Sequence, residues 1–145
     1  MSDWLTTAVQ QASWFDRIEG VTSVPTHWMR SLTRSFHPAG VIASAVAQQI
    51  GLPYLPLLHR VRSGPHQIGL SYTDRVKNVH GAFALRKGIA LRKARVLLID
   101  DVKTTGATLG ECVKILLRGG ASEVYGAVVA QAGWRGALGG PITTA

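Results

Sequence analysis

The sequence contains a single cysteine, Cys112. One cysteine cannot form an intrachain disulfide, so a disulfide-stabilised secreted scaffold is excluded and a reducing, cytoplasmic location is expected. Residues 1–4 lack the basic start of a signal peptide, which favours the same location. We expect Cys112 to be a buried core thiol, because it falls in a predicted helix rich in apolar residues.

Charged residues are missing from a second stretch, residues 35–58. A run of this length without charge raises the question of a membrane span. Polar and helix-breaking residues interrupt it, however, at Gln48, Gln49, Gly51, Pro53 and Pro56. We therefore interpret it as a buried helix followed by a strand and expect no membrane insertion.

Acidic residues are nearly absent from residues 59–95, where Asp74 alone opposes nine Lys and Arg residues. This segment therefore carries a net charge of +8, the same as the whole chain of 145 residues. Such a concentration of positive charge suits an anionic partner. Residues 59–80 also have few apolar side chains and no sustained period, which predicts a long, flexible, basic loop of the kind that often acts as a lid.

The strongest pattern lies in residues 95–108, RVLLIDDVKTTGAT. The apolar run at 96–99 predicts a central strand of a parallel sheet that is buried on both faces. Asp100 and Asp101 fall at its carboxyl end, where open α/β sheets bind their ligands. Small residues at 104–108 let a phosphate approach the backbone, and the following helix directs its positive end at the same place.

Local signals also predict where that helix begins, and they exclude one common type of phosphate-binding loop. Thr108 and Glu111 have capping-box spacing, which predicts a helix start at Thr108. The Gly-x4-Gly-Lys-Ser/Thr pattern of a Walker loop is absent. The acidic pair can take two sugar hydroxyls, and the loop can offer backbone N–H groups to a phosphate. The segment therefore predicts a site for a phosphorylated sugar.

The rest of the chain alternates helix and strand signals, which predicts one α/β domain over residues 1–145 with a parallel sheet and right-handed crossovers. We expect an amphipathic helix over residues 4–18, within an N-terminal segment of residues 1–19, and a loose tail at 133–145. The other predicted elements are strands at 20–24, 54–58, 82–85, 89–91 and 124–130, a helix from Pro38 to about Gly51, and a helix that ends at Gly119 and Gly120.

Residues 96–108 resemble the phosphoribosyl-pyrophosphate (PRPP) signature of type I phosphoribosyltransferases: an apolar run, two acidic residues, Val, any residue, then Thr-Thr-Gly-Ala-Thr. The wider chain, over residues 20–131, is similar to the ComF (competence protein F) family. The positions that carry this similarity are Val24-Pro25-Thr26-His27, Arg62, Gln67, Leu70-Ser71, Arg75, Asn78-Val79 and Gly81-Ala82-Phe83.

Two features depart from that family. Its Arg-Gly-Phe-Asn stands here as Arg34-Ser35-Phe36-His37, which puts in doubt any role of the glycine or asparagine. Many ComF proteins begin with a four-cysteine zinc module, which a chain with one cysteine cannot form, so no zinc is expected.

The resemblance implies a type I phosphoribosyltransferase fold, with a parallel sheet flanked by helices. It implies a pentosyltransferase that moves phosphoribosyl from PRPP with Mg²⁺ to a nitrogen acceptor and releases pyrophosphate. Asp100 and Asp101 are then the catalytic pair, binding the ribose hydroxyls directly or through Mg²⁺. The 5′-phosphate loop would comprise Lys103, Thr104, Thr105, Gly106, Ala107 and Thr108. Residues expected on the pyrophosphate side or in the lid are Pro25, Thr26, His27, Arg34, Arg62, Gln67, Arg75 and Asn78.

Two other functions stay open. ComF resemblance also implies a competence and DNA-uptake accessory that binds single-stranded DNA and a helicase partner, although Tyr72 and Phe83 are the only aromatic residues of the basic segment. A regulator that senses PRPP without turnover is the third alternative. Tyr125 and Trp134 are candidates for stacking on a nucleobase, with core packing favoured for each. The apolar face of the first helix favours a homodimer, and the acceptor is not specified.

Overall fold

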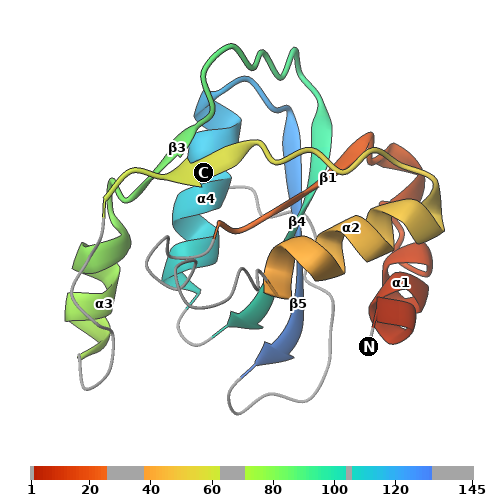
Figure 1. The fold of residues 1–145 in the computed structure, drawn as a ribbon, viewed down its shortest axis with the longest axis horizontal. Coiled ribbons are helices and arrows are strands. Elements are labelled where there is room, and N and C mark those ends of the chain that lie inside the picture. Colours follow the sequence, from red (N-terminus) through yellow and green to blue (C-terminus); the bar gives the residue numbers. More distant parts are fainter. Residues whose placement is uncertain (1, 26–37, 63–70, 104–105, 132–145) are drawn as a thin grey trace.

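The computed structural model describes residues 2–25, 38–62, 71–103 and 106–131. Three parallel strands form the main sheet: β1 (Gly20–Ser23), β4 (Arg95–Lys103) and β5 (Glu123–Gln131). Their order is β1-β4-β5, so β4 lies in the centre (Figure 1). The strands predicted at 20–24, 96–99 and 124–130 are thereby confirmed.

Helices cover both faces of this sheet, as Figure 1 shows. Helices α1 (Ser2–Gln10) and α2 (Pro38–Ile50) pack on one face, and α4 (Ala107–Arg118) packs on the other. A helix of this kind needs one apolar stripe, and α4 has it: Leu109, Cys112, Val113 and Leu116 are all buried. The burial of Cys112 confirms its prediction as a core thiol.

The central strand divides its side chains between two apolar clusters. Val96 and Leu98 pack toward α4, whereas Leu97 and Ile99 pack toward α1 and α2. All four are 2% exposed or less, because successive side chains of a strand point to opposite faces and both faces are covered. The prediction of a strand buried on both sides is therefore correct.

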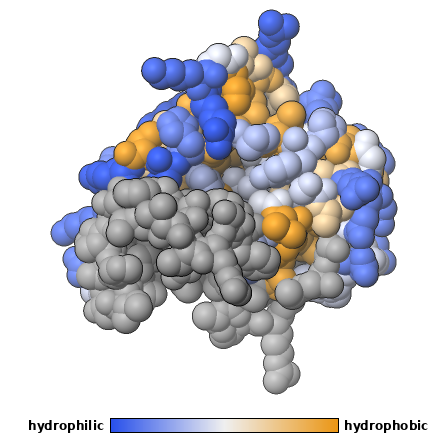
Figure 2. Space-filling view, viewed as in Figure 1, coloured by the Kyte–Doolittle hydropathy of each residue, from blue (hydrophilic) through white to orange (hydrophobic). Residues whose placement is uncertain are grey.

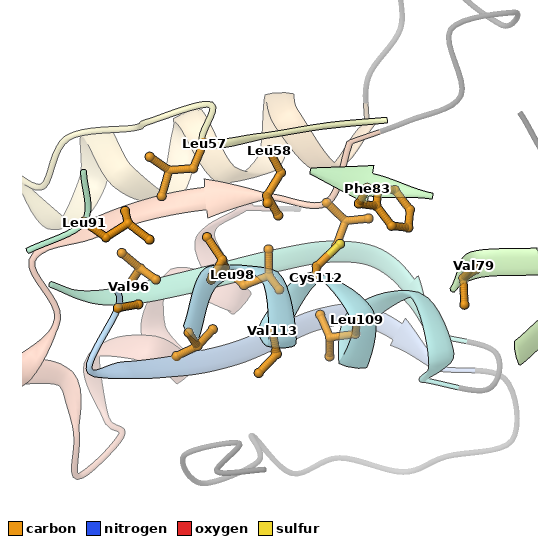
Figure 3. Packing of buried hydrophobic residues seen from close by; sticks show 14 of the residues in the cluster. Leu57, Leu58, Val79, Phe83, Leu91, Val96, Leu98, Leu109, Cys112 and Val113 are labelled. Atoms are coloured by element: carbon orange, nitrogen blue, oxygen red, sulfur yellow. The ribbon is translucent and has the colours of Figure 1, made fainter. Parts of the chain in front are cut away.

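A second, two-stranded sheet lies against the α4 face of the molecule. Its strands β2 (Leu58–Arg60) and β3 (Phe83–Leu85) are antiparallel. Leu58 and Phe83 belong to the same buried cluster as Cys112 (Figure 3). In the chain, helix α3 (Tyr72–Val79) comes between these two strands. It is capped by Ser71, whose Oγ accepts a hydrogen bond from the Asp74 backbone N–H.

Several predicted boundaries are wrong. The range 59–80, predicted as one long loop, contains the end of β2 and all of α3, because the Ser71 cap starts a helix that a search for apolar periodicity missed. Of the strand predicted at 54–58, Tyr54 forms only a single parallel bridge with Val21 of β1, and Leu58 begins β2 instead, since Pro56 cannot donate to a strand ladder. Residues 89–91 form no strand.

The N-terminal helix also ends earlier than predicted. Helix α1 stops at Gln10 and a short 3-10 helix, η1 (Phe15–Arg17), follows. The turn between them brings Trp14 into the core, where its ring stacks on Tyr125 with 4.7 Å between centroids. Within the described ranges, no helix is long and apolar enough to cross a bilayer.

Candidate functional site

The site is built where the carboxyl ends of β1 and β4 meet. Ser23 pairs with Ile99 in parallel register, and the Val24 backbone N–H donates to the Ile99 carbonyl at 2.9 Å. The chain continues from these points into Pro25 on one strand and Asp100 on the other. The predicted pyrophosphate turn therefore starts beside the predicted acidic pair, as parallel strands require.

The two aspartates differ in environment. Asp100 is 7% exposed, and its Oδ1 accepts the Asp101 backbone N–H at 2.9 Å. Asp101 is only partly buried. Because an ionised carboxylate accepts hydrogen bonds and does not donate them, both side chains suit ligand hydroxyls or a hard cation. We assign Asp101 the more accessible position and Asp100 the buried one.

A buried thiol lies close to the acidic pair. Burial raises the pKa of Cys112 well above its ordinary value of 9.0, and the charges of Asp100 and Glu111 raise it further, while Arg60 opposes them. Cys112 is therefore a protonated packing residue and not a nucleophile.

The loop after β4 leads into the N-terminus of α4. Gly106 is the N-cap, with a φ of 76° in the left-handed region that glycine adopts without strain. Its carbonyl accepts the first helical hydrogen bond, from the Gly110 backbone N–H at 2.8 Å. The positive end of the helix dipole consequently lies at the same edge of the sheet as Asp100 and Asp101.

This geometry corrects the predicted helix start. The helix begins at Ala107 and not with Thr108 as its cap, because Gly106 already makes the turn. Glu111, predicted to complete a capping box with Thr108, instead accepts a hydrogen bond from the Gly81 backbone N–H at 3.1 Å. That contact joins residues 30 positions apart, which no local pattern reveals.

The structure places only some of the predicted site residues. Backbone positions are described for Lys103 and Arg75, in β4 and α3. Asn78 is partly buried on α3, and the exposed Arg62 donates from Nη2 to the His80 carbonyl at 2.6 Å. The predicted residues outside the described ranges are Thr26, His27, Arg34, Gln67, Thr104 and Thr105, together with Trp134.

The structure also shows the surroundings of Tyr125 and Arg60. Tyr125 is fully buried against Trp14, so it is a packing residue as favoured. Arg60 was not predicted as a site residue. Its guanidinium lies over the Phe83 ring at 5.2 Å, its Nε donates to the Arg62 carbonyl, and burial lowers its pKa.

Comparisons with known proteins give relatives in sequence. No family model matches the chain. It is 34% identical over 112 residues to competence protein F of Haemophilus influenzae. This match covers 73% of this chain and 47% of that protein. It is 31% identical over 105 residues to the DNA utilization protein YhgH of Salmonella typhi, covering 72% and 45%. The chain thus spans about half the length of the curated relatives it matches.

Solved structures show the same fold. A purine phosphoribosyltransferase from Pyrococcus horikoshii matches with a TM-score of 0.58 at 15% sequence identity. The match covers 94% of this chain and 77% of that one.

Proposed function

Because this chain belongs to the ComF family and has the fold of the type I phosphoribosyltransferases, we propose that it binds PRPP and transfers its phosphoribosyl group to a nitrogen acceptor. One observation carries the proposal. The Asp100–Asp101 pair lies at the carboxyl edge of the sheet, between the start of the Pro25 turn and the N-terminus of α4. We propose that the acidic pair faces the sugar, the turn that starts at Pro25 faces the pyrophosphate, and the start of α4 faces the 5′-phosphate.

The acidic pair would hold the ribose. Asp101, the more exposed of the two, accepts hydrogen bonds from the ribose hydroxyls, and the buried Asp100 fixes the Asp101 backbone through its Oδ1. Departure of pyrophosphate leaves positive charge on the ribose. Negative carboxylates held close to that charge lower the barrier to this step.

The start of α4 would hold the 5′-phosphate. The glycine turn at Gly106 brings backbone, rather than side chain, to the ligand. Backbone N–H groups and the helix dipole both favour a phosphate at that point. Thr104 and Thr105 are proposed to complete the loop.

Mg²⁺ fits the acidic pair as a partner of the substrate. Within the described residues no group of three or more His, Cys, Asp or Glu side chains could hold a metal alone. Two adjacent carboxylates that share the ion with phosphate oxygens are the usual arrangement for Mg²⁺. When bound, the ion would neutralise the leaving pyrophosphate.

Calorimetric titration with PRPP in the presence of Mg²⁺ tests the binding step. We expect saturable binding by the natural chain and a loss of at least tenfold in affinity for Asp101→Asn. Asp16→Asn is the matched control, since Asp16 is an exposed carboxylate on η1, and its neighbours Arg17 and Glu19 contact the amino ends of β5 and β4, at the opposite end of these strands from Asp101. Absence of PRPP binding by the natural chain would refute the proposal.

Pyrophosphate release separates an enzyme from a sensor. A panel of purine, pyrimidine and amine acceptors should include one that releases pyrophosphate from PRPP, with Asp101→Asn slower by roughly 10² or more. Tight PRPP binding with no release by any acceptor would favour the regulatory alternative. That alternative also requires PRPP to change the affinity for another partner.

A nucleic-acid role has one specific observation in its favour. Arg86, Lys87, Arg92 and Lys93 are all exposed, in the connection between β3 and β4. Figure 1 draws this connection at the top of the molecule, and Figure 2, in the same view, shows hydrophilic side chains there. If single-stranded DNA binds there, affinity should fall steeply between 50 and 200 mM salt. A flat salt response, or unchanged binding after all four are replaced by Gln, would reject this role.

A further inference from the structure

One peptide group, between His80 and Gly81, is held from both sides by side chains distant in sequence. Its carbonyl accepts a hydrogen bond from Arg62 Nη2 at 2.6 Å. Its N–H donates to Glu111 Oε1 at 3.1 Å. The two side chains come from the segment after β2 and from the middle of α4. Both contacts are charge-assisted hydrogen bonds, and each orders a flexible side chain at a cost in entropy.

The Glu111 carboxylate is unusual in its burial. Its side chain is 9% exposed, with His80 Nδ1 at 3.7 Å and Lys114 Nζ at 3.9 Å as further neighbours. A buried carboxylate is unfavourable unless its hydrogen bonds are made. The Gly81 N–H supplies one, which explains why this glutamate turns toward the peptide and not toward the helix N-terminus.

Helix α3 depends on this peptide for its position. Among its described side chains, only Val79 is buried, and Val76, the next apolar one, is 39% exposed. A helix of eight residues is not stable without tertiary contacts. Figure 1 shows α3 at the edge of the molecule, beyond β3 and α4. The chain leaves α3 directly into the His80–Gly81 peptide, where Gly81 has a φ of 69°.

We propose that Arg62 and Glu111 are positioning residues that clamp the His80–Gly81 peptide and thereby set the place of α3 relative to α4. The inference deepens the proposed function, on which its ligand part rests. Helix α4 has Gly106 as its N-cap and carries Glu111 five residues later, so the start of α4 and the clamp belong to one helix. The clamp thus fixes α3, which carries Asn78, relative to the start of α4, where the 5′-phosphate is proposed to bind.

Amide hydrogen exchange tests the clamp without any ligand. Arg62→Met removes one donor at an exposed position and should leave the fold intact. Exchange of the amides of residues 76–82 should accelerate roughly ten- to hundredfold, while those of β4 and β5 stay unchanged. Arg86→Met, which removes an exposed arginine outside the clamp, is the control and should change neither set.

Glu111 is tested with a matched pair. Glu111→Leu removes the acceptor and should accelerate the same amides, whereas Glu111→Gln keeps an acceptor oxygen and should retain most of the protection. If Glu111→Leu does not fold, Arg62→Met and Glu111→Gln still decide the matter. Unchanged exchange at residues 76–82 in Arg62→Met would overturn the clamp.

Ligand binding supplies the second readout. In Arg62→Met the affinity for Mg²⁺-bound PRPP should fall about three- to tenfold, and added PRPP should slow exchange in α3 of the natural chain. If the natural chain binds no PRPP but the clamp variants show the exchange effect, the proposed function fails and the clamp stands. If PRPP binds and α3 exchange responds neither to the ligand nor to the variants, the clamp fails alone.

Discussion

At the scale of single residues, burial decides chemistry. Two acidic residues adjacent in sequence, Asp100 and Asp101, differ because one points into the protein and accepts a backbone N–H while the next is partly open. Cys112, fully buried behind them, keeps its proton. The same residue type is therefore suited to a structural role or to ligand binding according to its depth.

The raised pKa of Cys112 predicts a pH dependence of stability. Above pH 9 an unfolded thiol ionises, whereas the folded one stays protonated, so the free energy of unfolding should fall as pH rises. The contribution amounts to at most about 1.4 kcal/mol per pH unit. Urea unfolding between pH 7 and pH 10 measures it.

Cys112→Ala isolates that contribution. Burial also raises the pKa of Tyr125, but this residue is present in both proteins, so its contribution cancels in the comparison. The variant should be less stable at pH 7 because of the lost packing, yet lose less stability between pH 9 and 10. Parallel pH profiles for the two proteins would contradict the assignment.

At the scale of elements, the strand–loop–helix unit from β4 to α4 explains both fold and site. The strand is apolar because both faces are covered, and it becomes polar at Asp100, where its pairing with β1 ends while its pairing with β5 continues to Lys103. The helix starts at a glycine because the turn needs a positive φ. One continuous segment thereby places carboxylates and a helix N-terminus at the same edge.

Two glycines on this unit should respond oppositely to the same substitution. Gly106→Ala forces a side chain into a φ of 76° and should cost about 1–2 kcal/mol. Gly110→Ala, inside α4 with nothing within 4 Å of the added methyl, should stabilise by about 0.5–1 kcal/mol. Chemical denaturation measures both, and PRPP affinity should fall only for Gly106→Ala. Equal effects would argue against a left-handed turn at Gly106.

At the scale of the whole molecule, the positive charge and the acidic pair lie in different parts of the structure. The net charge of +8 lies in residues 59–95, which include the small sheet, α3 and the connection to β4. The acidic pair lies near the carboxyl end of the central strand of the main sheet. A polyanionic ligand would be attracted by the first and oriented by the second.

Ligand binding should stabilise the entire domain. With PRPP at 100 times its dissociation constant in the presence of Mg²⁺, mass action adds about 2.7 kcal/mol, which raises Tm by roughly 5–10 °C for a chain of this size. Scanning calorimetry measures the shift. At the same PRPP concentration it should fall to about half or less in Asp101→Asn and be retained in Asp16→Asn, and an equal shift in both variants would place the ligand elsewhere.

The sequence by itself determined the central strand, the acidic pair at its end and the parallel α/β architecture. These follow from the apolar run 96–99 and from turn chemistry within a few residues, which act whatever the rest of the chain does. Tertiary structure alone decided that Glu111 turns to Gly81, that Arg62 holds the His80 carbonyl, and that Trp14 stacks on Tyr125. Such contacts join residues 18 to 111 positions apart, and their partners are set by how layers pack and not by any local pattern.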